Sequence, residues 1–543
     1  MPKSFEYHAR IVGALTFVSR VSGFAREAVF SRVFGLGPIM DAFSFAFMMP
    51  NLFRRLFGEG ALSAAFLPRF VKLDAEDPES ARRFGALMLA VSGAAFFAVL
   101  AIIEIVLLVL WWNAPDYAVV FHPPARFGGA LLPSFSVHSA ALGYELAMIM
   151  MPYMPLVCLV ALSGAVLQSK ERFVVTAAAP IILNIAFVAA ALAGFPLLGD
   201  DVGRRSHILL VAASVLVAGL LQLAWTLSAL RKVGLVLEPR HPVAWEHVKR
   251  TLAESLPVML GMGVLQVNTF IDGLIASWPT LVGPTIFGFE YPLKPGAMAA
   301  FASAQRLYEF PLAIFGLSIA TAIYPMLARE SKNLDTFAST VRDGIQRAWF
   351  IGLPASVGLV LVAEPACGVA FQGSEFTYED TQRVAVILRG FAFAIWSYSI
   401  VHIVTRAFYA LEDRRTPLRV AYCMIGLNFV LNVTLIFTPL REAGLGYSTA
   451  FCSVVQSITL LCLLRRRVPT LLQGALIAAT LRTGVATLVM ALCVITTSAL
   501  IPVQTDWSSL LLRFLAEAGV GASSFAVSIY LLRSLAFKRQ PRS

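Results

Sequence analysis

The chain alternates between long apolar runs and short polar segments from one end to the other. Fourteen of these runs are long enough to cross a hydrocarbon core of about 30 Å as helices. The runs cover residues 11–36, 40–67, 84–112, 145–168, 174–197, 207–230, 253–279, 297–325, 345–364, 382–411, 417–438, 444–464, 475–502 and 508–534. The first, second, eighth and tenth are amphipathic. The pattern predicts an all-α polytopic membrane protein with 14 transmembrane helices.

Composition supports this prediction. Hydrophobic residues make up 58% of the chain and charged residues 14%, whereas soluble proteins carry about 25% charged residues. These values exclude a soluble multidomain enzyme, a disordered chain and, despite the net charge of +11, a nucleic-acid-binding protein. The six cysteines stand singly without a CxxC motif, so we interpret them as apolar packing residues rather than disulfides or zinc ligands.

The basic residues form two populations. Of the 43 lysines and arginines, 28 lie in turns on one side of the predicted spans and six lie on the other. The positive-inside rule therefore places both termini in the cytoplasm. The remaining nine are all arginines inside spans one, two, eight and ten, namely Arg20, Arg26, Arg32, Arg54, Arg55, Arg306, Arg383, Arg389 and Arg406.

The spacing of basic turns suggests a duplicated core. Six spans end at Arg231 and Lys232, and six more end at the cluster Arg465–Arg467. We predict an N-lobe over residues 1–232, a C-lobe over 233–467 related to it by an axis along the membrane normal, and two added helices over 468–543. The longest external segments are 113–144, for which proline and glycine predict irregular structure, and 280–296.

Four of the arginines lie too deep in their spans for snorkelling to explain them easily, namely Arg20, Arg26, Arg54 and Arg306. Each would cost about 2.5–3.5 kcal/mol if it faced lipid at the bilayer centre. Internal ion pairing is one explanation, since the same spans contain Glu27, Asp41, Glu59 and Glu309. The other is a water-filled cationic cavity for an anionic substrate, because the planar guanidinium binds phosphate oxygens bidentately. We favour the second explanation, with a diphosphate as ligand.

A second polar group lies in later spans and consists of Asp272, Asn428, Asn432 and Thr449. Hard oxygen ligands of this kind suit Na⁺ or a proton relay as a coupling ion. Hydrogen bonds that hold helices together are an equally good interpretation. No other cofactor is expected. A Walker A motif is absent, as are GxSxG and HExxH, so neither an on-chain ATPase nor a hydrolase is predicted.

Several motifs resemble one known family, the MurJ (MviN) lipid II flippases. The resemblance rests on SRVSGFAREAVFSRVFG (Ser19–Gly35), DAFSFAFMMPNLFRRLFGEGALSAAFLP (Asp41–Pro68), AQRLYEFP (Ala304–Pro311), FYALEDRRTP (Phe408–Pro417), PYMPLVCLVALSGAVLQSKERF and APIILNI. It covers essentially the whole chain. One departure is Met48, which stands where relatives often carry a basic residue.

This resemblance implies a fold and a function. The fold is that of the MOP exporter superfamily, with two MATE-like six-helix lobes and two C-terminal helices that help to form a groove for a lipid tail. The function is alternating-access transfer of lipid II, the undecaprenyl-pyrophosphate-linked disaccharide-pentapeptide, across the bacterial inner membrane for peptidoglycan synthesis. The family's substrate-binding positions fall on Arg20, Arg26, Arg54, Arg306, Glu27, Asp41 and Glu59. Its partners are lipid II, the membrane and other cell-wall synthesis proteins.

Three alternatives stay open at this point. An exporter of another lipid-linked oligosaccharide or of drugs would share the fold, although drug exporters tend to have acidic cavities. A polytopic membrane glycosyltransferase would need an acidic base on an external loop, and the first such loop, near Leu36–Met40, is too short to present one. A non-transporting scaffold would not need the intramembrane arginines.

Overall fold

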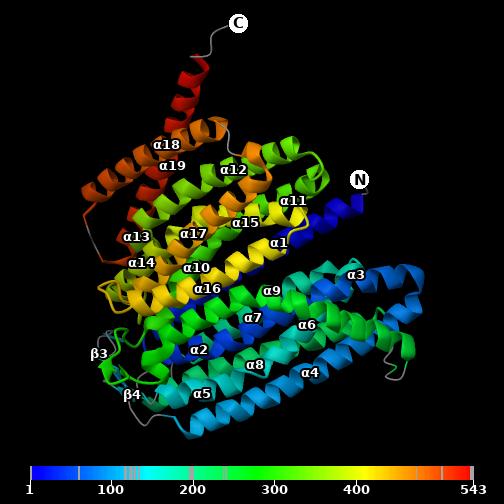
Figure 1. The fold of residues 1–543 in the computed structure, drawn as a ribbon. Coiled ribbons are helices and arrows are strands. Elements are labelled where there is room, and N and C mark those ends of the chain that lie inside the picture. Colours follow the sequence, from blue (N-terminus) through cyan, green and yellow to red (C-terminus); the bar gives the residue numbers. More distant parts are fainter. Residues whose placement is uncertain are drawn as a thin grey trace. The chain divides into compact units, whose positions relative to one another are not determined.

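The structure is a computed structural model that describes residues 3–58, 61–114, 119–121, 126–127, 130–131, 135–137, 139–194, 201–235, 238, 241–471, 474–502 and 505–538. Helices dominate the described chain (Figure 1). Internal contacts group it into two compact units, Met1–Ala299 and Ala300–Ser543, which we describe separately. The predicted lobes (1–232, 233–467 and 468–543) refer to an internal repeat rather than to this grouping, and they stay predictions.

The first unit is a bundle of helices. It contains α1 (Lys3–Phe34), α2 (Pro38–Phe53), a π-helical turn (Arg54–Gly58), α3 (Ala61–Glu76), α4 (Pro78–Trp112), α5 (Ser139–Met150), α6 (Tyr153–Ser169), α7 (Phe173–Ala193), α8 (Asp201–Arg231) and α9 (Pro242–Leu281). Aromatic residues of three of these helices form part of its core. The ring of Phe30 in α1 lies 4.6 Å from that of Phe43 in α2 and 4.8 Å from that of Phe187 in α7.

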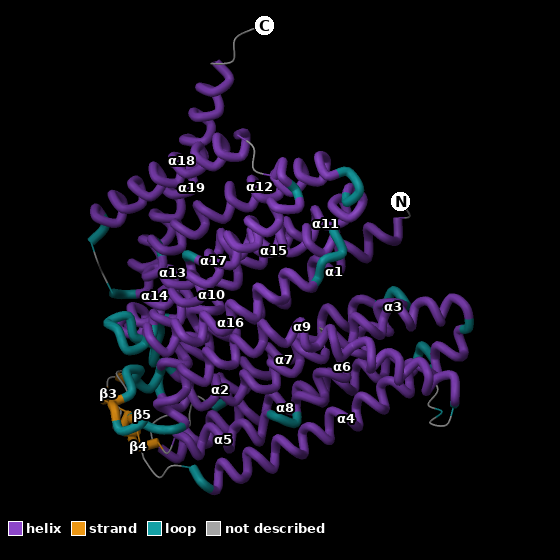
Figure 2. The backbone as a smooth tube through the Cα atoms, viewed as in Figure 1, coloured by secondary structure: helices purple, strands orange, loops and turns teal. Residues whose placement is uncertain are grey.

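Short strands accompany the loops of the first unit. They are β1 (Val119–Phe121), β2 (Arg126–Phe127), β3 (Ala130–Leu131), β4 (Phe135–Val137), β5 (Thr285–Ile286) and β6 (Phe289–Glu290). Antiparallel pairs form between β1 and β4, β2 and β3, and β5 and β6. Figure 2 shows these strands at one end of the helices of the first unit. Where segment 113–144 is described, it therefore contains paired strands rather than only the irregular structure that its prolines predict.

The second unit continues from the helix that begins in the first. It contains α10 (Ala297–Pro311), a π-helical turn (Leu312–Leu317), α11 (Ser318–Glu330), α12 (Leu334–Leu361), α13 (Ala363–Phe371), α14 (Tyr378–Ala392), α15 (Ala394–Ala410), α16 (Arg415–Leu435), α17 (Ala443–Arg467), a 3₁₀ turn (Pro469–Leu471), α18 (Gly474–Leu500) and α19 (Trp507–Lys538). Phe337 of α12 and Phe408 of α15 are fully buried in its core beside Leu464 of α17.

Local sequence explains where several helices begin. The Asp77 carboxylate accepts hydrogen bonds from the backbone N–H groups of Glu79 and Ser80, and Pro78 occupies the first helical position of α4. Hydrogen bonds from Ser80, and then from Glu79, hold the pKa of Asp77 below its usual value. Thr377 and Asp380 form a reciprocal capping box at the start of α14. Each cap satisfies donors that the first helical turn leaves without partners.

In its described residues, each predicted span coincides with one α-helix or with two consecutive α-helices. Within the residues that the structure describes, ten helices are long and apolar enough to cross a membrane. The predicted first, second, seventh and eighth spans are not among these ten, so the total of fourteen stays a prediction. The helical membrane architecture itself is confirmed.

Spans two and eight share a feature that hydropathy does not reveal. In each, a π-helical turn follows an α-helix in mid-span, at Arg54–Gly58 and at Leu312–Leu317. The predicted duplication pairs these two spans. Because π-helical turns occur frequently at functional sites, the turns draw attention to Arg54 and to the helix that carries Arg306.

Close packing of α14 against α17 provides a first testable prediction. A Cβ atom added to Gly446 would lie 2.7 Å from the carbonyl oxygen of Ile387 and 3.1 Å from the backbone nitrogen of Phe391. Backbone atoms cannot rotate away as a side chain can, so Gly446→Ala is expected to lower the free energy of unfolding by about 1–3 kcal/mol. Thermal unfolding in lipid nanodiscs measures this effect.

A matched control for this prediction lies in α16. A Cβ atom added to Gly426 would meet no heavy atom within 4 Å, so Gly426→Ala is expected to leave stability unchanged or raise it slightly. An equal melting temperature for the Gly446 variant and the wild-type protein would contradict the close approach of the two helices.

Candidate functional site

Arg26 is the most buried of the predicted substrate-binding arginines. It lies in α1 and is only 9% exposed. Its Nη1 donates a hydrogen bond to Oδ1 of Asn184 in α7 at 3.1 Å, and its Nη2 lies 3.4 Å from Oε2 of Glu27. The guanidinium carbon is 5.2 Å from the ring centroid of Phe187 and 5.6 Å from that of Phe47. Amide, carboxylate and aromatic faces thus stabilise a cation inside the first unit.

Glu27 therefore contacts one of the arginines with which it was predicted to act. Of the two explanations for the intramembrane arginines, internal ion pairing therefore applies to Arg26 and Glu27. It does not account for all of the contacts of Arg26, because an uncharged amide and two aromatic rings also surround the guanidinium.

Arg20 lies on the same helix as Arg26, about 9 Å away along the axis at 1.5 Å per residue. Its side chain is exposed, and it makes no hydrogen bond or ion pair with the residues that the structure describes. An arginine without a local carboxylate partner retains its donors for a ligand. Arg20 is thus more exposed than Arg26.

Arg54 begins the π-helical turn after α2. Its Nε donates to Oδ1 of Asn51 at 3.3 Å. Glu59, which was predicted to act with this arginine, lies outside the described residues.

Asp41 is fully buried, and its carboxylate accepts three hydrogen bonds. The donors are the Thr280 hydroxyl at 2.7 Å and the backbone N–H groups of Gly296 and Ala299 at 2.6 and 2.8 Å. The last two precede or open α10, so Asp41 acts as a distant N-cap for that helix. These contacts indicate a structural function for Asp41, whereas its predicted contact with substrate stays a prediction.

Arg306 lies in α10 within the second unit. Its side chain is 40% exposed, and its Nη1 is 3.9 Å from Oε2 of Glu309, one turn further along the helix. An ion pair at this distance and exposure is weak. The charge of Arg306 is therefore only loosely compensated by Glu309.

The predicted coupling-ion residues divide between the two units. In the first, Oδ2 of Asp272 accepts a hydrogen bond from Asn268 at 3.2 Å. In the second, Asn432 donates to Oδ1 of Asn428 at 2.9 Å, and Asn428 donates to the Ser448 hydroxyl at 3.3 Å. The Thr449 hydroxyl donates to the carbonyl of Leu445 at 3.0 Å.

Ser448 is the member of this second-unit group that sequence reasoning missed. It is buried and contacts Asn428 and also Asn432, to whose Oδ1 its hydroxyl donates. Its position beside Thr449 in α17 was the only sequence signal. The contacts fit both interpretations of this group, an ion site and a hydrogen-bonded link between α16 and α17.

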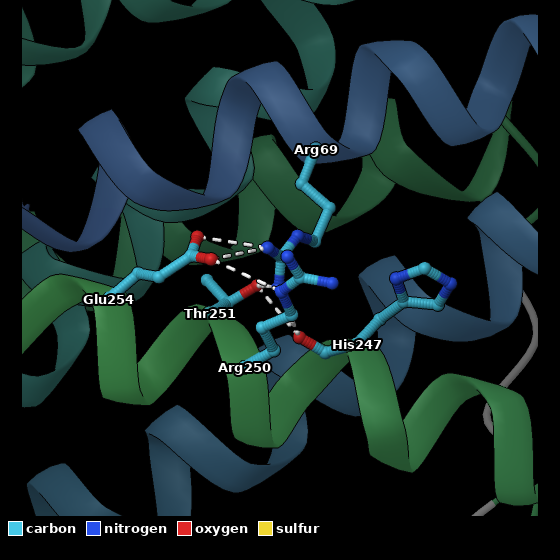
Figure 3. A network of polar contacts seen from close by, with 5 residues as sticks. All are labelled: Arg69, His247, Arg250, Thr251 and Glu254. Atoms are coloured by element: carbon cyan, nitrogen blue, oxygen red, sulfur yellow. Dashed lines mark hydrogen bonds and ion pairs between the residues drawn. The ribbon is translucent and has the colours of Figure 1, made fainter.

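A polar network joins α3 to α9 in the first unit (Figure 3). Arg69 Nη2 donates to both carboxylate oxygens of Glu254 at 2.8 and 2.9 Å, and Nη1 contacts the His247 carbonyl at 3.4 Å and the Thr251 hydroxyl at 3.5 Å. Arg250 Nε donates to the same carboxylate at 3.3 Å. Burial, together with the nearby charges of Arg69 and Arg250, lowers the pKa of His247. The network fixes the ends of these helices that the charge pattern assigns to the cytoplasm.

Within the second unit, charged and polar residues join the C-terminal helix α19 to α13 and α18. Arg513 of α19 donates to Glu517 at 2.8 Å, to Glu364 of α13 at 3.3 Å and to the Ser498 hydroxyl of α18 at 2.9 Å. A groove of about 610 Å³ lies between α18 and α19. Its lining combines apolar residues with three serines and a glycine, namely Val489, Cys493, Gly519, Val520, Ser523, Ser524, Val527, Ser528 and Leu531.

Known proteins match this chain in sequence. The family model described as "Lipid II flippase MurJ" matches residues 30–516. A protein of Rhizobium tropici named "Probable lipid II flippase MurJ" is 32% identical over 465 residues, which cover 84% of this chain and 80% of that protein.

Two solved structures show the same fold. One is a lipid II flippase MurJ in an inward closed conformation, which superposes with a TM-score of 0.74 at 20% identity over 97% of this chain and 99% of the other. The second is an inward-facing MATE-family multidrug transporter of the MOP superfamily, with a TM-score of 0.60 at 16% identity over 85% of this chain and 98% of the other. The predicted MATE-like fold class is confirmed.

Proposed function

This chain belongs to the lipid II flippase MurJ family, and from that membership we propose that it moves lipid II from the inner to the outer leaflet of the bacterial cytoplasmic membrane by alternating access. It is a multi-pass membrane protein and a transporter. Membership of this family separates it from drug exporters and from membrane glycosyltransferases. The excess of basic residues on one side supports cytoplasmic positions for both termini.

The observation that carries the proposal is the cation at Arg26. A guanidinium held inside a helical membrane protein by an amide and two aromatic rings suits a ligand with phosphate oxygens. Arg20, which is more exposed and lies on the same helix, would add further donors to this ligand. Arg306 of the second unit carries donors of the same kind. Arg26 is almost enclosed in the conformation described, so the headgroup reaches it in another conformation, as alternating access requires.

The lipid tail has a separate candidate position in the second unit. The groove between α18 and α19 is lined by valine and leucine side chains together with three serines, and its aliphatic part matches the chemistry of a polyprenyl chain. We assign the undecaprenyl tail to this groove. Contacts with other cell-wall synthesis proteins are part of the proposal as well.

Complementation of a bacterium depleted of its own lipid II flippase tests the proposed function. Expression of the wild-type chain is expected to restore growth and cell shape. Absence of rescue by a chain that is present and folded in the membrane would contradict the proposal.

Ion coupling is a further part of the proposal. Asn428, Asn432 and Thr449 would supply oxygen ligands to Na⁺, while Asp272 of the first unit, whose carboxylate can bind Na⁺ or a proton, is a separate candidate for ion coupling. Asn432→Leu removes an amide that bonds Asn428, so it is expected to abolish any stimulation of translocation by a Na⁺ gradient. Translocation in vesicles with and without the gradient measures this. Stimulation that survives the substitution would leave these residues with a structural function only.

A further inference from the structure

Asn184 is a buried amide in the middle of α7, a helix that is otherwise almost entirely apolar. It is 5% exposed. A buried amide is costly unless its donors and acceptor find partners, so the identity of those partners indicates what the residue is for.

The partners of Asn184 all belong to α1. Its Oδ1 accepts the hydrogen bond from Arg26, while its Nδ2 donates to the Ser22 hydroxyl at 2.9 Å and to the Ser19 carbonyl at 3.3 Å. A guanidinium can only donate and a carbonyl can only accept. These two contacts therefore fix the orientation of the amide, and the amide in turn fixes the position of Nη1 of Arg26.

The same face of α7 also supplies an aromatic ring to Arg26. Phe187 follows Asn184 by three residues, which places both side chains on one face of the helix. Its ring lies beside the guanidinium, with Phe47 of α2 also close. The guanidinium is thus held at Nη1 by Asn184, at Nη2 by its neighbour Glu27 and over its surface by rings.

From this geometry we propose that Asn184 is a positioning residue for lipid II binding: it holds Arg26 in the orientation that receives the diphosphate. The inference rests on the proposed function and adds a residue to it. Arginine has a long side chain with many rotamers, and a ligand that binds a pre-ordered guanidinium does not have to immobilise it. Asn184 thereby raises affinity without touching the substrate.

A purely structural function would be to hold α1 against α7. That contact has other support, because the rings of Phe30 and Phe187 meet at 4.8 Å. We therefore expect Asn184→Leu, which keeps a similar volume but removes both hydrogen-bonding groups, to give a folded protein with a less ordered Arg26.

The test is a double-mutant cycle on lipid II affinity, measured with the full chain in lipid nanodiscs. Asn184→Leu is expected to weaken binding about 10-fold, the loss that follows when one hydrogen bond to a charged group no longer orders the site. Arg26→Lys weakens binding as well, because lysine lacks the planar fork. The double variant is expected to bind no more weakly than Arg26→Lys alone, since no guanidinium is left for Asn184 to hold.

Two further variants keep the test decisive. Ser22→Ala removes one partner of the Asn184 amide and is expected to weaken binding about twofold to threefold, so it supports the proposal even where Asn184→Leu folds poorly. Thr176→Val changes a polar residue of α7 that contacts Phe173 and Gln168 instead of Arg26, and it is expected to bind as the wild-type protein does.

The outcomes separate the two levels of the proposal. Wild-type affinity in a folded Asn184→Leu variant would overturn the positioning function, and so would losses that multiply in the double variant, which indicate an independent structural effect. Failure of the folded wild-type protein to bind lipid II would overturn the proposed function itself. The two failures are distinguishable, because the second is seen with the wild-type protein, before any residue is substituted.

Discussion

Arg26→Ala is expected to lower lipid II translocation about 100-fold or more while the protein still inserts in the membrane. Hydrogen bonds to charged groups contribute about 1.5–3 kcal/mol each, and each 1.4 kcal/mol corresponds to a factor of ten. Loss of two such bonds to a diphosphate therefore exceeds a 100-fold effect. The substitution also removes the partner of Asn184 and the cation between Phe47 and Phe187. Initial translocation rates in reconstituted vesicles measure the loss.

Two comparisons make this result specific. Arg26→Lys keeps the charge but loses the planar fork, so its rate is expected to stay well below that of the wild-type protein. Lys332→Ala removes a basic residue from the turn after α11 and is expected to leave the rate unchanged. A translocation rate for Arg26→Ala within twofold of the wild-type rate would show that Arg26 does not bind the substrate.

Asp41→Ala is expected to destabilise the protein more than Gly446→Ala does. It would leave three buried donors without an acceptor, the Thr280 hydroxyl and the N–H groups of Gly296 and Ala299. Each unsatisfied buried group costs about 1–3 kcal/mol, so the free energy of unfolding should fall by about 3 kcal/mol or more. Thermal unfolding of the purified protein in lipid nanodiscs measures the change.

The conservative variant distinguishes capping from charge. Asp41→Asn keeps one acceptor oxygen and is expected to lose less stability than Asp41→Ala. The contrary outcome is an Asp41→Ala variant that has the melting temperature of the wild-type protein but fails to bind lipid II. It would show that Asp41 contacts the substrate, as the sequence predicted, and does not cap α10.

The positions of the spans were predictable because hydrophobicity and positive charge are properties of single segments. Where the structure describes it, each apolar run lies on one helix or on consecutive helices. The breaks within spans two and eight were not predicted. Glycine or proline stands in or beside both π-helical turns, Arg54–Gly58 and Leu312–Leu317, but such residues also stand inside helices without a π-helical turn, as Pro180 does in α7.

The site was predicted in part for the same reason. Depth within a span and the cost of burial singled out four arginines without knowledge of their contacts, namely Arg20, Arg26, Arg54 and Arg306. The contact of Asp41 with Gly296 joins residues 255 apart in sequence, and no local pattern reports such a partner. In the sequence, Asn184 is only a single polar residue in an apolar segment. Its proposed function depends on its contact with Arg26 of α1, which the sequence does not show.

The most direct test of the proposed function follows lipid II in vesicles that contain this protein and no other. The fraction of lipid II accessible to an external, membrane-impermeant reagent is measured over time for the wild-type protein and for Arg26→Ala. We expect the wild-type protein to expose lipid II from the inner leaflet, whereas vesicles with Arg26→Ala remain at the level of protein-free vesicles. Equal exposure by both proteins, or none by the folded wild-type protein, would contradict a flippase that binds its substrate through Arg26.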